Sequence, residues 1–343
     1  MQSHSRQQLS TAEMKSKTEI RKSVETDPVV RFGALTARCP DCHAQPLIAG
    51  KAKASCTFCQ GDFPILNGVP VLIRHDNPIF PLESYVACRL QRAKPGAALS
   101  RLVPAPSVNL SIERSLLAFR EELGKFGQSY VLVVGSGKQR ERLESFFPKS
   151  GKIRLVCCDV DLNAVVDVLC DGHELPFDDG VFQGVIATAV LQHVLYPERV
   201  ATEMFRVLSS GGVIYSEVAF MQQVCEGAYD YTRYSLSGHR VLLKKFRELS
   251  AGVVAGSGTS LVWAIENFFL SFFRTQRSRA VTKAVVRLSL FWLKYFDYLL
   301  ENNSATIDAA SCTYFLGIKN SAAGTSEQEI VNNYVGRKYL RHT

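Results

Sequence analysis

The sequence predicts an α/β fold in which a parallel sheet is covered by helices on both faces and is preceded by a small domain held together by four cysteines. Between residues 111 and 220, short β-favouring apolar runs alternate with segments of helical spacing. Such alternation is typical of parallel strands joined by crossover helices. Nearer the N-terminus, thirteen residues separate two Cys-x-x-Cys pairs, a spacing typical of metal-binding modules.

Composition agrees with a folded protein of about two domains. The chain has 343 residues, of which 46% are hydrophobic, enough for a substantial core. Lys and Arg exceed Asp and Glu by 40 to 32, an excess that permits an anionic partner without requiring one. The polar N-terminal segment lacks the apolar core of a signal peptide, and no long uncharged apolar run occurs. We therefore expect a cytoplasmic protein without a conventional transmembrane span.

The cysteine pairs predict a structural zinc site. Residues 1–32 read as a disordered polar leader, and residues 33–75 form a compact module containing both pairs. Each pair closes a tight turn, and two such turns complete a tetrahedral Zn²⁺ site with no open position. Two disulfides would call for an oxidising compartment, and a redox dithiol would not need two matched pairs. The expected ligands are Cys39, Cys42, Cys56 and Cys59.

The α/β domain is expected to begin after a proline-rich linker over residues 76–107, in which a short helix could start near Leu82. The expected helices cover 111–127, 140–147 and 197–208, with a short one after Asp161. The expected strands cover 131–134, 154–160, 184–190, 212–220, 249–256 and 311–320. A helical insertion over about 257–308 precedes the last strand, and residues 321–343 form a tail.

The first strand of the alternation runs into the loop Gly135, Ser136 and Gly137, as in folds that bind a nucleotide-like cofactor. A dinucleotide site would want a third glycine at Arg140, and a phosphate-binding P-loop would need a hydroxyl residue after Lys138. A third reading is S-adenosylmethionine, which has no phosphate and needs only a close backbone approach. The loop by itself does not name its cofactor.

Downstream residues indicate the family. Asp159 ends the second strand, Asp171 follows in VLCDG, and Leu-Pro-Phe stands at 175–177 before Arg-Val-Leu-x-x-Gly-Gly at 206–212. In this order they resemble the class I S-adenosylmethionine-dependent methyltransferases, of the type 11-like group. The resemblance implies a methyltransferase enzyme with a Rossmann-like, seven-stranded sheet over residues 108–320.

The resemblance also implies a set of cofactor contacts. Gly135 and Gly137 would line the methionine part, Asp159 the ribose and Asp171 the adenine amino group. The complete set is Gly135, Ser136, Gly137, Asp159, Val160, Asp171, Gly172 and Ala189. This chain departs from the family at Val133, where an acid is usual, and at Gln139, where a glycine is usual. These departures motivate an alternative of another class, a non-catalytic scaffold that binds zinc and cofactor.

The cysteine module has a resemblance of its own. Together with GDFPILNGVPVLI, which follows directly, it resembles the zinc ribbons that serve as methyltransferase activator subunits or precede methyltransferase domains. Asn67-Gly68 within this stretch predicts a hairpin turn between two short strands.

The expected acceptor residues follow the fourth and fifth strands. His193 is a candidate general base, although a packing role fits it equally well. Tyr229, Asp230, Arg233 and Tyr234 lie where acceptors bind in open α/β folds. This cluster resembles a Tyr-Asp-x-x-Arg-Tyr stretch of methyltransferases linked to surface polysaccharide or glycolipid synthesis, and a structural loop is the alternative. We expect methyl transfer to a small-molecule or carbohydrate- or glycolipid-type acceptor.

Two further partners are weighed. Methylation of rRNA or tRNA is the alternative enzymatic reading, but the ribbon itself offers few basic residues, chiefly Lys51 and Lys53. Residues 283, 287, 294, 297 and 301 place charges on one stripe of the insertion and leave the rest of its circumference apolar. The preferred interpretation is a helix packed as a lid over the active site, and peripheral membrane contact is the alternative.

Overall fold

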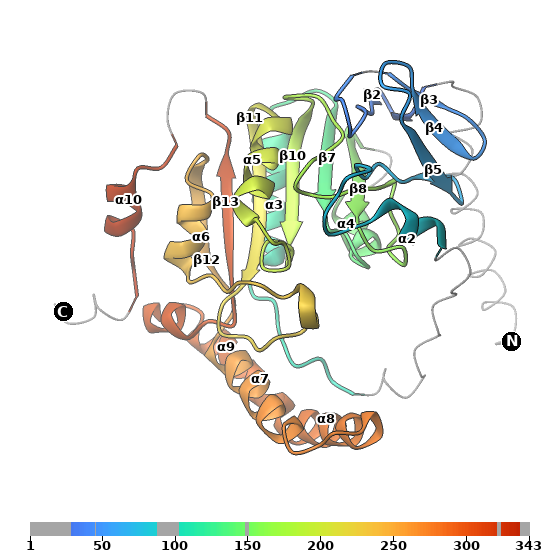
Figure 1. Ribbon diagram of the computed structural model, residues 1–343. Coiled ribbons are helices and arrows are strands. Elements are labelled where there is room, and N and C mark those ends of the chain that lie inside the picture. Colours follow the sequence, from blue (N-terminus) through green and yellow to red (C-terminus); the bar gives the residue numbers. More distant parts are fainter. Residues whose placement is uncertain (1–28, 45, 88–102, 148–150, 321–323, 337–343) are drawn as a thin grey trace, which may run out of the picture.

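The computed structural model describes residues 29–44, 46–87, 103–147, 151–320 and 324–336. Residues 1–28 of the expected leader and residues 88–102 of the expected linker lie outside these residues. A central sheet carries the zinc-ribbon module at one edge, and a group of helices extends below it in the view of Figure 1. The expected disorder of the leader therefore stays a prediction.

The central sheet has seven strands, as predicted. Its order is β12-β13-β11-β10-β7-β8-β9. Only β13 is antiparallel to its neighbours, β11 and β12. The strands are β7 (Ser129–Val134), β8 (Ile153–Asp159), β9 (Val168–Leu169), β10 (Phe182–Thr188), β11 (Leu208–Ala219), β12 (Arg247–Ala255) and β13 (Cys312–Ile318).

Helices cover both faces of this sheet, which explains why β7 is apolar at almost every position. Val131 and Val133 pack in a core with α3 (Ile112–Leu123) and α4 (Arg140–Phe146). Leu132 and Val134 point to the opposite core, which includes α5 (Pro197–Val207) and the residues after α6 (Leu236–Leu242). Because successive side chains of a strand point to opposite faces of the sheet, the single apolar run of β7 contributes to both cores.

The ribbon module is built from short antiparallel strands. They are β1 (Arg31–Phe32), β2 (Leu35–Thr36), β3 (Leu47–Ala49), β4 (Lys53–Cys56), β5 (Asp62–Leu66) and β6 (Val69–Pro70). Asn67 and Gly68 have φ of 52° and 84° and join β5 to β6, so the expected hairpin turn is confirmed. β1 starts at Arg31, two residues inside the expected leader.

The ribbon and the central sheet are joined by backbone bonding and by a shared core. Val71 forms a parallel bridge with Leu169 of the edge strand β9, and the amide of Leu72 donates to the carbonyl of Leu169 at 2.7 Å. Phe63 and Leu72 belong to the same buried cluster as the residues beneath α5. The ribbon therefore extends the hydrophobic core of the sheet.

The insertion between β12 and β13 is helical, as predicted. It contains α7 (Ser257–Leu270), α8 (Gln276–Leu290), the 3-10 turn η5 (Phe291–Tyr295), α9 (Phe296–Leu300) and η6 (Ser304–Ala309). The charged stripe faces the protein, because Lys283 and Arg287 lie against Glu266 and Asp297 is fully buried. Much of the apolar circumference is exposed, and the expected role of the helix as a lid over the active site stays a prediction.

Two local differences separate the structure from the sequence expectations. The short helix expected after Asp161 is wrong: residues 161–167 form a turn in which the amide of Asn163 donates to the Asp161 carboxylate at 2.9 Å. The segment expected to be a tail contains α10 (Glu327–Asn332), which is tied to α6 by the bond from Arg240 to the carbonyl of Asn333. No helix in the described part of the chain is both long and apolar enough to span a bilayer.

Candidate cofactor and metal sites

The four predicted zinc ligands converge on one point. The Sγ atoms of Cys39 and Cys59 lie 3.6 Å apart, as do those of Cys42 and Cys56, and all four lie within 4.8 Å of one another. Zn–S bonds of about 2.3 Å in a tetrahedron put sulfur atoms about 3.8 Å apart. The donor set and its spacing therefore fit a closed, structural Zn²⁺ site.

Each cysteine pair is held by the same backbone turn. The amide of His43 donates to the carbonyl of Cys39 at 2.9 Å, and the amide of Gln60 donates to that of Cys56 at 3.1 Å. His43 and Gln60 both adopt positive φ, 60° and 62°, which few residues other than glycine do. The two halves of the site are thus matched in backbone as well as in sequence.

The predicted cofactor loop follows β7 at the carboxyl edge of the sheet. Gly135 and Gly137 have φ of 61° and 49°. A Cβ on Gly135 would lie 2.3 Å from Val190, whereas a Cβ on Gly137 would meet nothing within 4 Å. Between them, Ser136 Oγ is buried without a hydrogen-bond partner among the described residues. Open space over Gly137 beside an orphaned hydroxyl fits a ligand that approaches the backbone closely.

Asp159 stands at the end of β8 beside this loop. Its Oδ2 accepts from the amide of Gly137 at 2.7 Å, and its Oδ1 accepts from Val160 at 2.7 Å and Asp161 at 3.0 Å. A carboxylate offers about four lone-pair positions, so these three bonds leave room for one more donor. Asp159 thus shapes the loop, and its predicted ribose contact stays a prediction.

Asp171 is buried next to Gly172 behind the edge strand β9. Its Oδ1 accepts from the amide of His173 at 3.0 Å and lies 2.6 Å from His173 Nδ1. Its Oδ2 accepts from the Asn77 side chain at 2.8 Å. Burial opposes ionisation, but the His173 and Asn77 hydrogen bonds outweigh it and lower the pKa of Asp171. The lowered pKa favours the charged carboxylate, and its predicted adenine contact stays a prediction.

Val133 and Gln139, the two departures from the family pattern, both make contacts within the protein. Val133 is buried in the core under α3 and α4. Gln139 stands at the start of α4, where its Oε1 accepts from Thr188 Oγ1 at 2.5 Å. This bond joins the cofactor loop to the end of β10 across the sheet edge. A glycine at position 139 would lack that link.

Glu217 is an acid at this edge that the sequence analysis did not select. It stands near the end of β11, paired in register with Thr188. Its Oε1 accepts from Tyr215 at 2.5 Å and from the Asn109 side chain at 3.1 Å. Burial raises the pKa of this carboxyl. A lone acid in the apolar strand VIYSEVAF was the signal that could have identified it.

The end of β10 is strained where the acceptor is expected. Ala189 is exposed and has φ of 56°, in the left-handed region that costs a non-glycine residue about 1–2 kcal/mol. Its amide donates to the carbonyl of Glu217 at 2.9 Å. Strain of this kind gathers at functional sites, in keeping with the predicted position of Ala189 at the cofactor.

His193 follows four residues later and has a defined orientation. Its Nδ1 lies 2.9 Å from the carbonyl oxygen of Tyr229, so Nδ1 carries the proton and donates. The lone pair is then on Nε2, which lies 3.9 Å from the thiol of Cys225. Burial raises the pKa of that thiol. His193 thus has a ring fixed through Nδ1, with Nε2 as the nitrogen left for proton transfer.

The predicted acceptor loop includes the 3-10 turn η4 (Gly227–Tyr229) and is held by one ion pair. Arg233 and Asp230 bond through both guanidinium nitrogens Nη1 and Nη2. The remaining N–H groups of Arg233 donate to the carbonyls of Gln222, Gln223 and Thr232. The Arg233 guanidinium holds the pKa of the Asp230 carboxyl well below its usual range. Asp230 and Arg233 therefore hold the loop in shape.

Two tyrosines of this loop differ in accessibility. Tyr229 is 50% exposed and its ring stacks on Phe80, with centroids 6.2 Å apart. Tyr234 is partly buried; its amide donates to the carbonyl of Ala219 at 3.0 Å, and burial raises the pKa of its phenol. Of the four predicted acceptor residues, Tyr229 offers the most surface to a ligand. Their contact with an acceptor stays a prediction.

The segment after the ribbon crosses the same edge. Asn77 bonds Asp171, Phe80 stacks on Tyr229, and Tyr85 in α2 (Leu82–Ala87) donates to the carbonyl of Val160 at 2.8 Å. These residues were expected to be part of a linker. The two hydrogen bonds join residues that are 94 and 75 positions apart in the sequence. No local sequence pattern could have predicted them.

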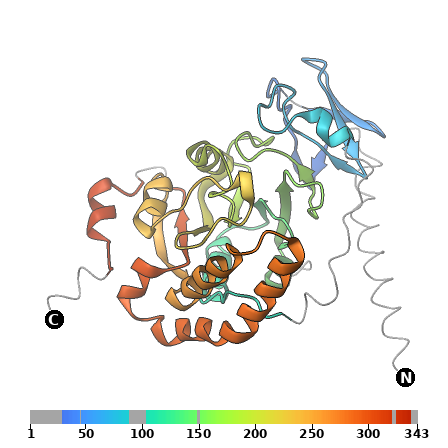
Figure 2. The same ribbon diagram turned by 60° about the horizontal axis from the view of Figure 1, so that its bottom comes forward.

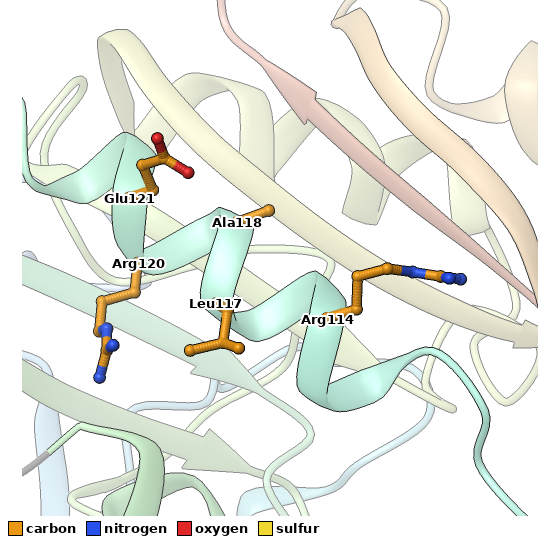
Figure 3. A pocket seen from close by; sticks show the side chains of 5 residues that line it. All are labelled: Arg114, Leu117, Ala118, Arg120 and Glu121. Atoms are coloured by element: carbon orange, nitrogen blue, oxygen red, sulfur yellow. The ribbon is translucent and has the colours of Figure 1, made fainter.

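A cavity of about 560 Å³ lies elsewhere, along α3 (Figure 3). Arg114, Leu117, Ala118, Arg120 and Glu121 line it, all from one helix. None of them belongs to the predicted cofactor or acceptor set, so we assign this cavity no role in the chemistry. A second cavity of about 600 Å³ lies between the ribbon and α5, lined by residues that include Arg38, His173 and Glu203.

The family model described as a methyltransferase domain matches residues 118–216. Solved structures with a similar fold include a chain from the complex of the Haloferax volcanii Trm112 methyltransferase activator with a putative methyltransferase. That match has 16% identity, 61% of this chain and 92% of that chain covered, and a TM-score of 0.39.

Two further structures are methyltransferases. One is phosphoethanolamine N-methyltransferase 2 of Haemonchus contortus with S-adenosyl-L-methionine, at 15% identity and TM-score 0.40, covering 61% of this chain and 53% of that one. The other is a putative sarcosine dimethylglycine methyltransferase of Galdieria sulphuraria, at 15% identity and TM-score 0.40, covering 61% and 86%. No curated protein matches the sequence. The family match, which runs from within α3 to within β11, shows that this chain carries a methyltransferase domain.

Proposed function

We propose that this methyltransferase acts on a small-molecule or carbohydrate- or glycolipid-type acceptor bound beneath the loop around η4. The observation that carries the proposal is a pair of partly exposed tyrosine rings near the carboxyl ends of the parallel strands. Tyr229 and Tyr231 are 50% and 39% exposed, and the amide of Tyr231 donates to the carbonyl of Gln192 beside His193. Exposed aromatic faces near a fixed imidazole suit a polar ring that is apolar on one side.

The cofactor contacts follow from the same edge. Gly135, Ser136 and Gly137 would lie under the methionine part, Asp159 and Val160 beside the ribose, and Asp171 with Gly172 at the adenine. The methionine part carries an ammonium group, and Val133 offers it no charge. Glu217 is the acid available nearby, since Asp159 and Asp171 already accept several hydrogen bonds.

His193 is the proposed base. S-adenosylmethionine supplies a methyl group already activated on a sulfonium, so the protein mainly aligns donor and acceptor. The Nδ1 bond to the carbonyl of Tyr229 fixes the ring and leaves Nε2 to take the acceptor's proton. Replacing His193 by alanine should lower kcat by roughly 10²–10⁴ with a smaller effect on cofactor affinity. His43→Asn, at a surface histidine of the ribbon, is the control, because asparagine tolerates the positive φ of this position.

We further propose that the four cysteines hold a structural Zn²⁺ that shapes the ribbon. Their closed arrangement supports a role in folding. Because the ribbon shares its core with the sheet and its following segment reaches Asp171 and Tyr229, metal binding would also position the edge of the cofactor site.

Methylation of RNA is the second enzymatic candidate, and the ribbon argues against it. Lys53 pairs with Asp62 at 2.6 Å, Arg38 with Asp178 at 3.3 Å, and Arg74 with Glu174 at 3.4 Å. Basic side chains committed to carboxylates make a weak phosphate-binding surface.

Calorimetry and label transfer test these proposals. The zinc-loaded protein should bind S-adenosylmethionine and its demethylated product, and Asp159→Ala should abolish binding while Asp161→Ala retains it. Label from methyl-tritiated cofactor should then enter the organic-phase or glycan fraction of a cell extract. Label in the RNA fraction would favour the nucleic-acid candidate. Absence of cofactor binding by folded, zinc-loaded protein would refute both enzymatic candidates, whereas cofactor binding without label transfer to any fraction would favour the scaffold.

A further inference from the structure

The α7–α8 hairpin buries a charged pair and exposes many apolar side chains. Between the helices, Glu266 is 1% exposed and bonds Arg287 through both carboxylate oxygens, at 2.5 and 3.0 Å. Lys283 lies 3.7 Å from the same carboxylate. Charged side chains thus share the buried side of the hairpin with the apolar side chains of Val262, Leu270 and Val286.

Many other apolar side chains of the insertion lie on its outer surface. Residues 257–300 contain fourteen of the twenty-eight exposed large apolar side chains of the described chain, although they are a small part of it. They are Leu261, Phe268, Phe269, Phe272, Phe273, Val281, Val285, Leu288, Phe291, Trp292, Tyr295, Phe296, Tyr298 and Leu299. A patch of this size on one element marks an interaction surface.

The exposed side chains form two connected groups. At the tip, Phe268 packs edge to face on Phe269 and on Phe272, with centroids 5.4 and 5.3 Å apart. Along α8, η5 and α9, a second group recurs at helical spacing, so it forms one stripe. Its members are Val281, Val285, Leu288, Trp292, Tyr295 and Leu299. The surface is continuous enough to meet an extended apolar partner.

The charges around this surface have one sign. Arg274, Arg277, Arg279 and Lys283 are exposed at or near the tip. The acids of residues 257–300 are Glu266 and Asp297, which are 1% and 0% exposed. Every exposed charge of the hairpin is therefore positive. Phenyl rings bordered by cations complement the acyl and phosphate layers of an anionic bilayer.

Length excludes a spanning role for these helices. At 1.5 Å per residue, α8 with 15 residues is about 22 Å long, short of the roughly 30 Å hydrocarbon core. We propose that the α7–α8 hairpin docks on the surface of an anionic lipid membrane, with the rings at its tip in the headgroup boundary and Arg274 and Arg277 on lipid phosphates. The docking does not depend on the proposed acceptor.

The hairpin is attached at the carboxyl edge of the sheet. α7 starts directly after β12, and the chain returns through η6 to β13 at that edge. Figure 1 shows the helices beyond this edge, and Figure 2 shows them in front of it once the molecule is turned. A membrane held by the hairpin would lie on the side of the protein that carries the cofactor loop and His193.

Vesicle binding tests the proposal with the full, zinc-loaded chain. It should float with vesicles of equimolar phosphatidylcholine and phosphatidylglycerol and much less with phosphatidylcholine alone. Phe268→Ser with Phe272→Ser should weaken binding roughly a hundredfold or more, and Arg274→Gln with Arg277→Gln roughly thirtyfold. Val331→Ser and Arg120→Gln, exposed residues outside the hairpin, are the matched controls and should bind as the original protein does.

Tryptophan fluorescence locates the contact. The chain has two tryptophans; Trp292 lies on the apolar stripe, whereas Trp263 donates to Ser107 on the protein side. Brominated lipids should quench Trp292, and the quenching should disappear in Trp292→Phe. Binding that survives the double phenylalanine substitution would overturn the proposal. So would self-association that requires Phe268 and Phe272 without vesicle binding, which would identify a second copy of the chain as the occupant.

Discussion

The zinc ribbon and the helical insertion are both appended to one sheet, at opposite edges, and they use apolar residues in opposite ways. The ribbon contributes Leu47, Phe63 and Leu72 to a core that continues under the sheet. The insertion leaves Phe268 and Leu299 in solvent, 60% and 78% exposed. The ribbon buries its apolar side chains in a shared core, whereas the insertion leaves many of its apolar side chains exposed on the surface that we propose contacts a membrane.

The insertion must then be held by polar contacts, and the structure shows which. Trp263 donates to Ser107 at 3.1 Å, and Lys294 donates to the carbonyl of Ala105 at 2.7 Å. Asp297 caps the start of α7 from within α9, accepting from the amides of Gly256, Gly258 and Thr259. A module can thus be anchored firmly while its hydrophobic face stays open.

Both modules reach the candidate site through an asparagine. On the ribbon side Asn77 donates to Asp171 at 2.8 Å, and on the insertion side Asn109 donates to Glu217 at 3.1 Å. Asn109 belongs to the segment that seats Trp263 and Lys294. Changes in either module can therefore alter a buried carboxylate at the sheet edge.

The largest effect should follow loss of the metal. Cys56→Ser, or removal of zinc with a chelator, should unfold the ribbon and lower the Tm of the whole protein by roughly 10 °C or more, because metal binding supplies folding energy and the cores are shared. Thermal unfolding alongside measurement of bound zinc checks this. Cys225→Ser, outside the ribbon, should change neither. An unchanged Tm after stoichiometric zinc loss would show that the ribbon does not stabilise the sheet.

The anchor of the insertion should come next. Asp297→Asn should cost about 2–4 kcal/mol in urea unfolding, because a buried carboxylate that accepts four hydrogen bonds is lost. Hydrogen exchange should rise within residues 257–300. Glu301→Gln removes the more exposed pair with Arg114 and should cost less than about 1 kcal/mol. Equal losses of unfolding free energy for the two changes would mean that the buried Asp297 contacts do not anchor the insertion.

A smaller, pH-dependent effect is expected at Glu217. Burial raises the pKa of this carboxyl above its ordinary value of 4.5. Protonation of Glu217 therefore contributes to the free energy of unfolding. This contribution is complete below pH 4.5 and is lost as the pH rises through the raised pKa. Glu217→Gln should thus gain Tm over the original protein as the pH increases from 4 to 8, while its affinity for S-adenosylmethionine falls. A pH-independent difference in Tm would remove this role.

The smallest effect is expected at Ala189, the residue with positive φ after the end of β10. Ala189→Gly should raise the free energy of unfolding by up to about 1 kcal/mol, because glycine adopts positive φ without a Cβ clash. Ala187→Gly, a buried residue of β10 without this strain, should instead lower it by about 1 kcal/mol. Destabilisation by both changes would argue against strain at Ala189.

The sequence predicted features whose cause is local. Cysteine spacing set the ligand turns, and Asn67-Gly68 set a hairpin through its φ preferences. Continuous apolar runs marked strands that are covered on both faces, as in β7. The helix expected after Asp161 failed for an equally local reason, since its side chain bonds the backbone of a turn.

The site was only partly predictable. The glycines and Asp159 meet at one edge as expected, because parallel strands end together. Glu217 was missed because an acid in an apolar strand gives no sign of its neighbours. Its partner Asn109 lies 108 residues away, and no periodicity encodes such a pair.

By itself, the sequence predicted the four converging cysteines, the order of strands and helices and the methyltransferase domain, because turns, periodicity and spacing act over a few residues. Tertiary structure decided what those elements face. The charged stripe of the insertion could have pointed either way. It turned inward because Glu266 and Asp297 bond with Arg287 and the start of α7, and burying those charges in matched contacts left the aromatic rings outside.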